Sequence, residues 1–203
     1  VAFITQSNGE NIFNQQNAYS VQALQQLFED NGYDVTTVDI TSDDISAETY
    51  DVAVLPAPQN DLTEDGIKKL TEFLYNNGDY SKQLMYFADY TQSATPNINE
   101  FLELWGIQVD DCIVRESDSS KNQQATISLG TAAFPVASIV EAGDEDTSYS
   151  DGLSNTTLPI IAPLSKSVKL LWDSNNERST QALLKTDDTC YEYPLSALKK
   201  SSD

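Results

Sequence analysis

The feature that most constrains the fold is an alternation of short apolar segments with longer amphipathic segments over the first half of the chain. Strands are expected at residues 2–5, 34–40, 51–55 and 84–88. Helices are expected between and after them, at about 15–31, 63–77 and 95–106. This order produces right-handed crossovers and a parallel sheet. The sequence therefore predicts an α/β fold, a flavodoxin-like, doubly wound and mostly parallel sheet with helices on both faces.

Individual residues support these elements. The run Asp51-Val52-Ala53-Val54-Leu55 is continuously apolar after its first residue, as in strands at the centre of a parallel sheet. Thr63 is a favourable N-cap, and Glu64 and Asp65 follow it near the positive end of the helix dipole. Pro96 is placed at the first position of the third helix.

The pattern changes after Arg115. Short β-like runs follow at residues 125–129, 136–140, 168–172 and 182–184, and residues 143–157 are acidic and rich in Ser and Gly. We expect a flavodoxin-like core over 1–115 and a β- and loop-rich continuation of the same domain over 116–203. Residues 199–203 are expected to begin a linker. The start at Val1, without Met, predicts that upstream sequence has been removed and that any membrane anchor lies outside this chain.

The charge of the chain excludes several classes of partner. Eleven Lys and Arg against 32 Asp and Glu give a net charge of −21, and the first basic residue is Lys68. Nucleic acid and anionic lipid are therefore disfavoured as partners, because both are recognised through basic side chains. No stretch approaches the ~18 apolar residues of a membrane-spanning helix.

The residues available for chemistry are also limited. The chain has no histidine, which removes imidazole-activated nucleophiles and His-ligated zinc. Cys112 and Cys190 form no CxxC motif, and either a disulfide between them or two separate buried thiols is compatible with the sequence. No glycine-rich phosphate motif is present, and the acidic run at 143–152 does not fit an EF-hand. We expect no cofactor, no metal and no catalytic residues.

A ligand of such a sheet would bind beyond the carboxyl ends of the strands. The candidate binding residues there share short amide, hydroxyl or carboxylate groups: Gln6, Ser7, Asn8, Glu10, Gln59, Asn60, Asp61, Asp89 and Tyr90. They suit a neutral polar or cationic ligand. The alternative is that they cap helices and form turns, as Asn, Asp and Ser do routinely. A further alternative is that Glu10, Asp61 and Asp89 include the paired carboxylates of a glycoside hydrolase.

The same elements carry a family resemblance. Its residues occur in order as Gly9-Glu10, Asn31-Gly32-Tyr33-Asp34-Val35, Val38-Asp39-Ile40, Tyr50 to Thr63, Leu70-Thr71-Glu72-Phe73-Leu74 and Asn99 to Ile107. Over residues 1–115 the chain resembles the extracytoplasmic domain of the GldG-like ABC-transporter auxiliary family, which is related to gliding-motility transport proteins. The histidine that often precedes Gly-Glu in that family is replaced here by Ser7-Asn8, so any role of that histidine does not carry over.

The resemblance implies a flavodoxin-like domain between membrane helices, on the extracytoplasmic face of a bacterial membrane, beside ABC permease and ATPase subunits. The expected function is that of a membrane-anchored, non-catalytic accessory domain that binds a partner subunit or the transported substrate. Two alternatives are a carboxylate-dependent hydrolase of carbohydrate or peptide and a free-standing receptor for a polar ligand.

Overall fold

The computed structural model describes residues 1–6, 18–121, 123–127, 130–134, 136–139, 160–161, 164–176 and 178–200. The chain divides into two compact units, Val1–Phe101 and Leu102–Asp203. The division falls within a helix, α3 (Pro96–Leu104), which begins at the predicted proline. None of the helices described is both long and apolar enough to cross a membrane.

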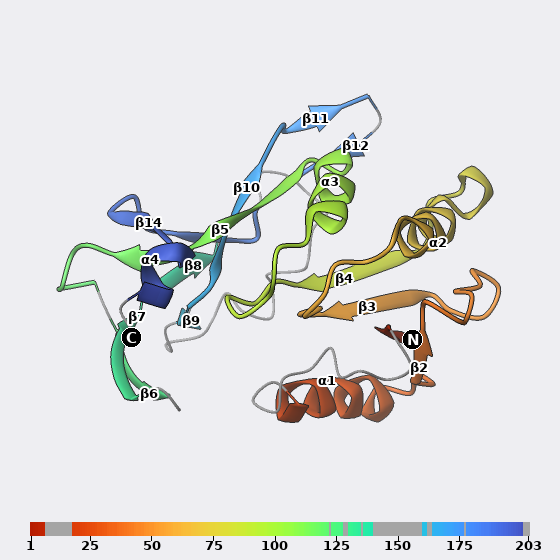
Figure 1. Cartoon of the computed structure of the whole chain (residues 1–203), viewed down its shortest axis with the longest axis horizontal. Helices are drawn as coiled ribbons and strands as arrows, with labels where there is room; N and C mark the ends of the chain where they lie inside the picture. The colour runs from red at the N-terminus through yellow and green to blue at the C-terminus, as the bar shows by residue number, and fades with distance from the viewer. Residues whose placement is uncertain are drawn as a thin grey trace. The chain divides into compact units, whose positions relative to one another are not determined.

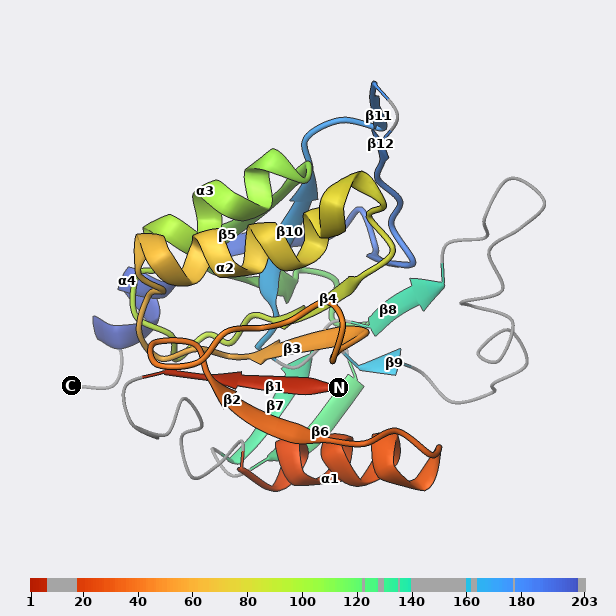
Figure 2. The same cartoon turned by 90° about the vertical axis from the view of Figure 1, so that its right-hand side faces the viewer.

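The first unit contains a four-stranded parallel sheet of order β2-β1-β3-β4. Its strands are β1 (Ala2–Thr5), β2 (Thr36–Asp39), β3 (Val52–Pro56) and β4 (Gln83–Phe87). The central strands β1 and β3 are buried along their whole length. Helices α1 (Ala18–Asp30) and α2 (Glu64–Tyr75) cover opposite faces of this sheet (Figure 2). The predicted α/β fold with a parallel, doubly wound sheet is confirmed.

The hydrophobic core on the α1 face joins the helix to β1 and β3. Phe3 and Val54, both fully buried, pack with Val21 of α1, and Phe28 meets the Phe3 ring edge-on at 6.1 Å between centroids. Gly32 ends this helix in the left-handed conformation (φ 85°), as its position after residue 31 predicts.

Helix α2 begins and ends as its sequence indicates. The Thr63 hydroxyl accepts a hydrogen bond from the Gly66 amide (3.1 Å), so Thr63 is the N-cap that the sequence predicts. Leu70 and Phe73 form its buried stripe. Asn76 caps the C-terminus in the left-handed conformation, and a short 3₁₀ turn, η1 (Asn76–Gly78), follows.

The second unit is rich in antiparallel strands, as expected for the C-terminal part (Figure 1). Its central sheet has the order β10-β5-β14, built from β5 (Ile107–Glu116), β10 (Lys166–Leu170) and β14 (Cys190–Pro194). The remaining elements are β6 (Gln123–Ile127), β7 (Gly130–Phe134), β8 (Val136–Ile139), β9 (Ile160–Ile161), β11 (Ser174–Asn175), β12 (Arg178–Ser179), β13 (Leu184–Thr186) and α4 (Leu195–Lys200).

The pairing of strand β5 assigns it to the second unit. The sequence groups it with residues 1–115, but both of its partners come from the last 40 residues of the chain, and both pairings are antiparallel. Contact clustering accordingly places β5 in the second compact unit, Leu102–Asp203.

Candidate functional site

The carboxyl edge of the parallel sheet holds the candidate residues that follow β1, β3 and β4. Gln6 comes directly after β1, and only 4% of its surface is exposed. Its side-chain amide donates to the backbone carbonyl of Asn60 (2.8 Å), which lies in the loop after β3. Gln59, in the same loop, donates from its side chain to the carbonyl of Ala57 (3.0 Å). Both amides therefore bind the protein's own backbone.

Asp61 caps the N-terminus of α3. Its Oδ2 accepts from the Asn97 amide (2.8 Å), and its Oδ1 accepts from the amides of Ile98 (3.1 Å) and Leu62 (3.0 Å). Asn97 completes the contact by donating from its side chain to the Leu62 carbonyl (2.7 Å). A carboxylate at this position satisfies amides that have no partner within the helix, and it interacts favourably with the helix dipole.

Asp89 organises the turn after β4. Its Oδ1 accepts from both the amide (2.8 Å) and the hydroxyl of Thr91. Gln92, which is 4% exposed, accepts from the Asp89 amide and donates to the carbonyl of Pro58 (3.0 Å). Partial burial, followed by the nearby Asp89 carboxylate, raises the pKa of Tyr90.

The structure thus brings Gln6 to the loop that contains Asn60 and Asp61. Gln6 and Gln59 bind backbone carbonyls, Asp61 caps α3, and Asp89 holds a turn. Ligand binding by this edge stays a prediction, and Ser7, Asn8 and Glu10 lie outside the described residues. Gln92 carries no sequence pattern that marks it as part of this edge. Its buried amide joins the loops after β3 and β4, 34 residues apart, and no local pattern marks such a contact.

The two cysteines are free thiols on neighbouring strands of the second unit. Cys112 of β5 lies opposite Pro194, and Cys190 of β14 lies opposite Glu116, so the strand register separates them. Desolvation, followed by the carboxylates of Glu192 and Asp110, raises the pKa of Cys112. Desolvation, followed by Glu116, raises that of Cys190. Both thiols are therefore held protonated, which makes them weak nucleophiles.

A second polar cluster surrounds Cys112. One donor atom from each of Asp110, Cys112 and Glu192 lies within 4.8 Å of the others. The Lys169 ammonium is 2.6 Å from oxygens of both Asp110 and Glu192. Lys169 lowers the pKa of both carboxylates, and they raise its own. The space between the carboxylates thus already holds a cation. The sequence did not reveal this cluster because its carboxylates are 82 residues apart.

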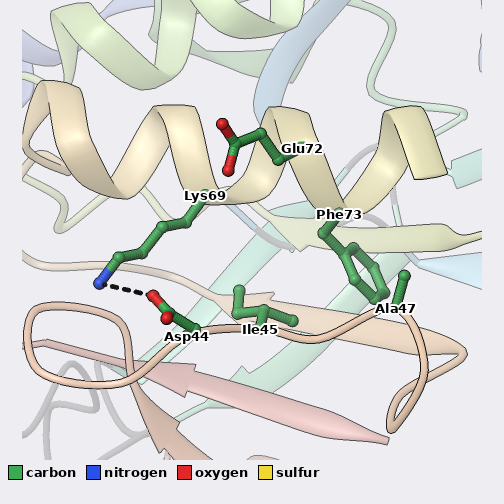
Figure 3. A pocket seen from close by; sticks show the side chains of 6 residues that line it. All are labelled: Asp44, Ile45, Ala47, Lys69, Glu72 and Phe73. Atoms are coloured by element: carbon green, nitrogen blue, oxygen red, sulfur yellow. Dashed lines mark ion pairs between the residues drawn. The ribbon is translucent and has the colours of Figure 1, made fainter. Parts of the chain in front are cut away.

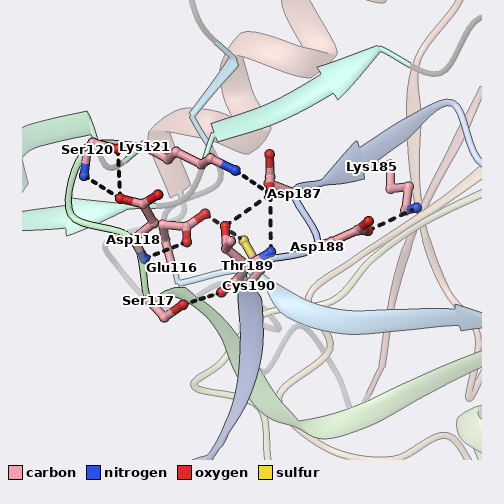
Figure 4. Close-up of polar contacts among 10 residues, drawn as sticks. All are labelled: Glu116, Ser117, Asp118, Ser120, Lys121, Lys185, Asp187, Asp188, Thr189 and Cys190. Atoms are coloured by element: carbon pink, nitrogen blue, oxygen red, sulfur yellow. Dashed lines mark hydrogen bonds and ion pairs between the residues drawn. The ribbon is translucent and has the colours of Figure 1, made fainter.

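Two hollows have polar walls. One of about 250 Å³ lies in the first unit between residues 44–47 and α2, with the Lys69–Asp44 ion pair at one end (Figure 3). The other, of about 360 Å³, lies in the second unit and includes Lys185, Asp187, Cys190 and Glu192 in its lining. Figure 4 shows that Asp187 binds Lys121 (2.8 Å) and that the Cys190 thiol donates to Glu116 (3.3 Å). The charged groups of these walls form ion pairs, either within the wall, as in Lys69–Asp44 and Lys185–Asp188, or with lysines outside it, as in Asp187–Lys121.

Comparison with known proteins supports the fold. No protein-family model matches the chain, and no curated protein matches it with significant sequence similarity. Among solved structures, the chain is similar to the mmIFT52 N-terminal domain, with a TM-score of 0.62 at 14% sequence identity. The match covers 94% of this chain and 75% of that one. At this identity the likeness shows the fold alone.

Proposed function

We propose that this chain is a non-catalytic binding domain, which holds a partner protein rather than transforming a substrate. The observation that carries the proposal is the use of the polar groups at the carboxyl edge of the parallel sheet. Asp61 accepts three backbone amides and Asp89 accepts a backbone amide and a hydroxyl, so both carboxylates are committed to holding loops in place.

Catalysis by these carboxylates is disfavoured on physical grounds. Protonation of Asp61, or its attack on a substrate, would remove an acceptor from the amides at the start of α3, and unsatisfied amides are costly. The thiols of Cys112 and Cys190 are also poor nucleophiles, because their raised pKa values keep them protonated. These arguments favour the binding function over the carboxylate-dependent hydrolase.

The biological setting of the proposal rests on the family resemblance of residues 1–115. In that setting the domain belongs to a membrane-anchored auxiliary subunit of a bacterial ABC transporter and lies on the extracytoplasmic face. Its partners are the permease and ATPase subunits, of which the ATPase supplies ATP hydrolysis, and anchoring is through segments outside this chain. The high net negative charge suits an exposed domain that stays soluble.

Co-expression tests the proposal. The chain, in its natural full-length protein, is tagged and expressed with the permease and ATPase encoded beside its gene, and the complex is purified in detergent. We expect the subunits to elute together at a fixed ratio, whereas a tag-only control retains neither. Failure to retain either subunit contradicts the transporter assignment. Turnover of glycoside or peptide substrates by the purified chain, lost in Asp61→Asn, contradicts the non-catalytic assignment.

A further inference from the structure

Three side chains that can ligate a metal lie on one face of the sheet β10-β5-β14. Asp110 and Cys112 are two residues apart on β5, so their side chains point to the same face. Glu192 of β14 pairs with Val114, the next residue of β5 on that face. One donor atom of each of the three side chains lies within 4.8 Å of the others. The strand register therefore brings two carboxylates and a thiol together.

A cation already lies between the two carboxylates. Lys169 of β10 pairs with Gln108, which lies on the same face, and its ammonium is 2.6 Å from an oxygen of Asp110 and of Glu192. The Lys169 side chain is 48% exposed, so it can turn into solvent without burying its charge elsewhere. The ammonium thus marks a cation position whose occupant can be exchanged.

The buried thiol indicates which kind of cation suits this position. Cys112 is 7% exposed, and its sulfur accepts a hydrogen bond from the Ser167 amide. Among the described residues, none accepts a hydrogen bond from its S–H. The Lys169 ammonium therefore satisfies the carboxylates and leaves the thiol proton without an acceptor. Ca²⁺ and Mg²⁺ take oxygen ligands, whereas Zn²⁺ binds thiolate sulfur together with carboxylate oxygen.

The distances and the neighbouring donors also suit zinc. Bonds of about 2.0–2.3 Å to oxygen and sulfur place tetrahedral ligand atoms roughly 3.5 Å apart, so small side-chain rotations close the cluster around an ion. The Gln108 side chain donates to Asp110 (2.6 Å). The Ser167 hydroxyl donates to Glu192 (2.8 Å), and the Ser167 amide donates to Cys112. Donors in these outer positions hold metal ligands in place.

A hollow gives an ion access to the cluster. Ser167 and Glu192 form part of the wall of the hollow of about 360 Å³ in the second unit. The three ligands, Lys169 and the hollow all belong to that unit. The geometry of the site therefore depends on one compact unit alone.

We propose that Asp110, Cys112 and Glu192 bind one Zn²⁺ ion, which displaces the ammonium of Lys169. On binding, the Cys112 thiol gives up its proton to solvent, and the Lys169 side chain turns away. The proton and the ammonium together carry the same charge as Zn²⁺, so the exchange leaves the net charge of the site unchanged. The ion joins β5 to β14, and a fourth position stays open for water. The inference goes beyond the proposed function and departs from the expectation of no metal, which rested on sequence motifs.

Titration of the full chain with Cd²⁺ tests the site, because a cadmium–thiolate bond has its own ultraviolet charge-transfer band. Excess Ca²⁺ is present to occupy exposed carboxylates, and Zn²⁺ is added last as a competitor. We expect one Cd²⁺ per chain, with the thiolate band, and its release by Zn²⁺. Cys112→Ser should abolish the band and weaken binding at least about tenfold. Cys190→Ser is the matched control, because that thiol also lies beside a carboxylate, Glu116, and its removal should change the affinity by at most about twofold.

Removal of the lysine provides a second test. Lys169→Ala removes the competing ammonium and should tighten Cd²⁺ binding at least about tenfold. A gain of affinity cannot result from misfolding, so this variant decides the question even if Cys112→Ser does not fold. Lys185→Ala removes the same charge from an exposed pair with Asp188 and should change the affinity by at most about threefold.

Four results would overturn the inference. A band that survives Cys112→Ser, or is lost in Cys190→Ser, shows that Cys112 is not the ligand. Uptake of Cd²⁺ without a band shows adventitious binding to carboxylates. Equal affinities of Lys169→Ala and Lys185→Ala show attraction by overall charge. Cd²⁺ that Zn²⁺ does not release shows that the site does not take zinc. Metal binding without retention of transporter subunits leaves this inference standing and removes only the transporter assignment.

Discussion

Single side chains hold the loops at the carboxyl edge of the parallel sheet, and Asp61 makes three of these contacts. We expect Asp61→Ala to lower the free energy of unfolding by about 1–2 kcal/mol, the usual cost of losing a helix cap. Asp61→Asn keeps an acceptor and should lose less. Urea titration measures both, with Glu48→Ala, a change at an exposed carboxylate, as the control. Equal stability of Asp61→Ala and Glu48→Ala would contradict the capping role.

Two glycines with positive φ, when replaced by alanine, distinguish the cost of a steric clash from the cost of the left-handed backbone conformation. A Cβ added to Gly32 (φ 85°) meets nothing within 4 Å, whereas one added to Gly106 (φ 80°) lies 2.5 Å from the Trp172 ring. Gly32→Ala should therefore cost only the left-handed conformation, about 1–2 kcal/mol. Gly106→Ala should cost a further ~1–3 kcal/mol for overpacking. Thermal unfolding of both variants measures the difference, and equal losses would mean that the Trp172 ring moves aside freely.

The residue scale also shows what a sequence can predict about a site. The N-cap Thr63 and the first-turn proline Pro96 were predicted because each acts within its own helix. Asp61 caps a helix that begins 35 residues later, and Gln6 binds a carbonyl 54 residues away. A short polar residue after a strand has the same local sequence whether it binds a ligand or binds the protein's own backbone. The sequence therefore placed these residues at one edge but did not decide what they bind.

Among the secondary-structure elements, α2 binds the loop after β2 through Lys69. Its ammonium donates to the carbonyls of Ile40 and Asp43, each at 3.0 Å, and its side chain is 17% exposed. We expect Lys69→Met to cost about 1–2 kcal/mol, because hydrogen bonds from a charged donor are lost. Lys68→Met is the matched control, since Lys68 is 71% exposed and should change stability by at most ~0.5 kcal/mol.

Hydrogen exchange distinguishes a local from a global effect of Lys69→Met. The amides of residues 40–44 should exchange faster in this variant even under conditions where the rest of the first unit keeps its protection. Unchanged exchange in that loop would show that the contacts around Lys69 contribute no stability to it.

The sheet β10-β5-β14 is joined across its strands by Lys169, which binds Asp110 and Glu192. These carboxylates have ordinary pKa values of 3.8 and 4.5, and Lys169 lowers both. A lowered pKa in the folded state stabilises the protein above the unfolded-state value, and this contribution is lost as the pH falls through the folded-state value. Lys169→Met should therefore be less stable than the parent at pH 6–8, with the difference shrinking below about pH 4.

Chemical denaturation at a series of pH values measures this difference. Lys185→Met removes the same charge from a more exposed pair with Asp188 and provides the comparison. If the free energy of unfolding of the two variants depends on pH in the same way, the cross-strand position of Lys169 adds no stability beyond that of an exposed ion pair.

The elements themselves were largely predictable, but their partners were not. The continuous apolar run of β3 and the helical period of α2 are local patterns that specify an element directly. The pairing of β5 with β10 and β14 depends on strands far along the chain, and several registers would satisfy the same alternation of side chains. The four-stranded parallel sheet was therefore predicted, whereas the central sheet of the second unit was not.

At the scale of the whole molecule, the net charge of −21 opposes compaction. Raising NaCl from 0.02 to 0.5 M shortens the Debye length from about 20 Å to about 4 Å, which screens this repulsion. If screening contributes about 1–2 kcal/mol, the thermal midpoint should rise by roughly 2–8 °C for a chain of this size. KCl should have the same effect, because screening depends on ionic strength. A midpoint that falls with NaCl would mean that the ion pairs stabilise the fold more than the surplus of negative charge destabilises it.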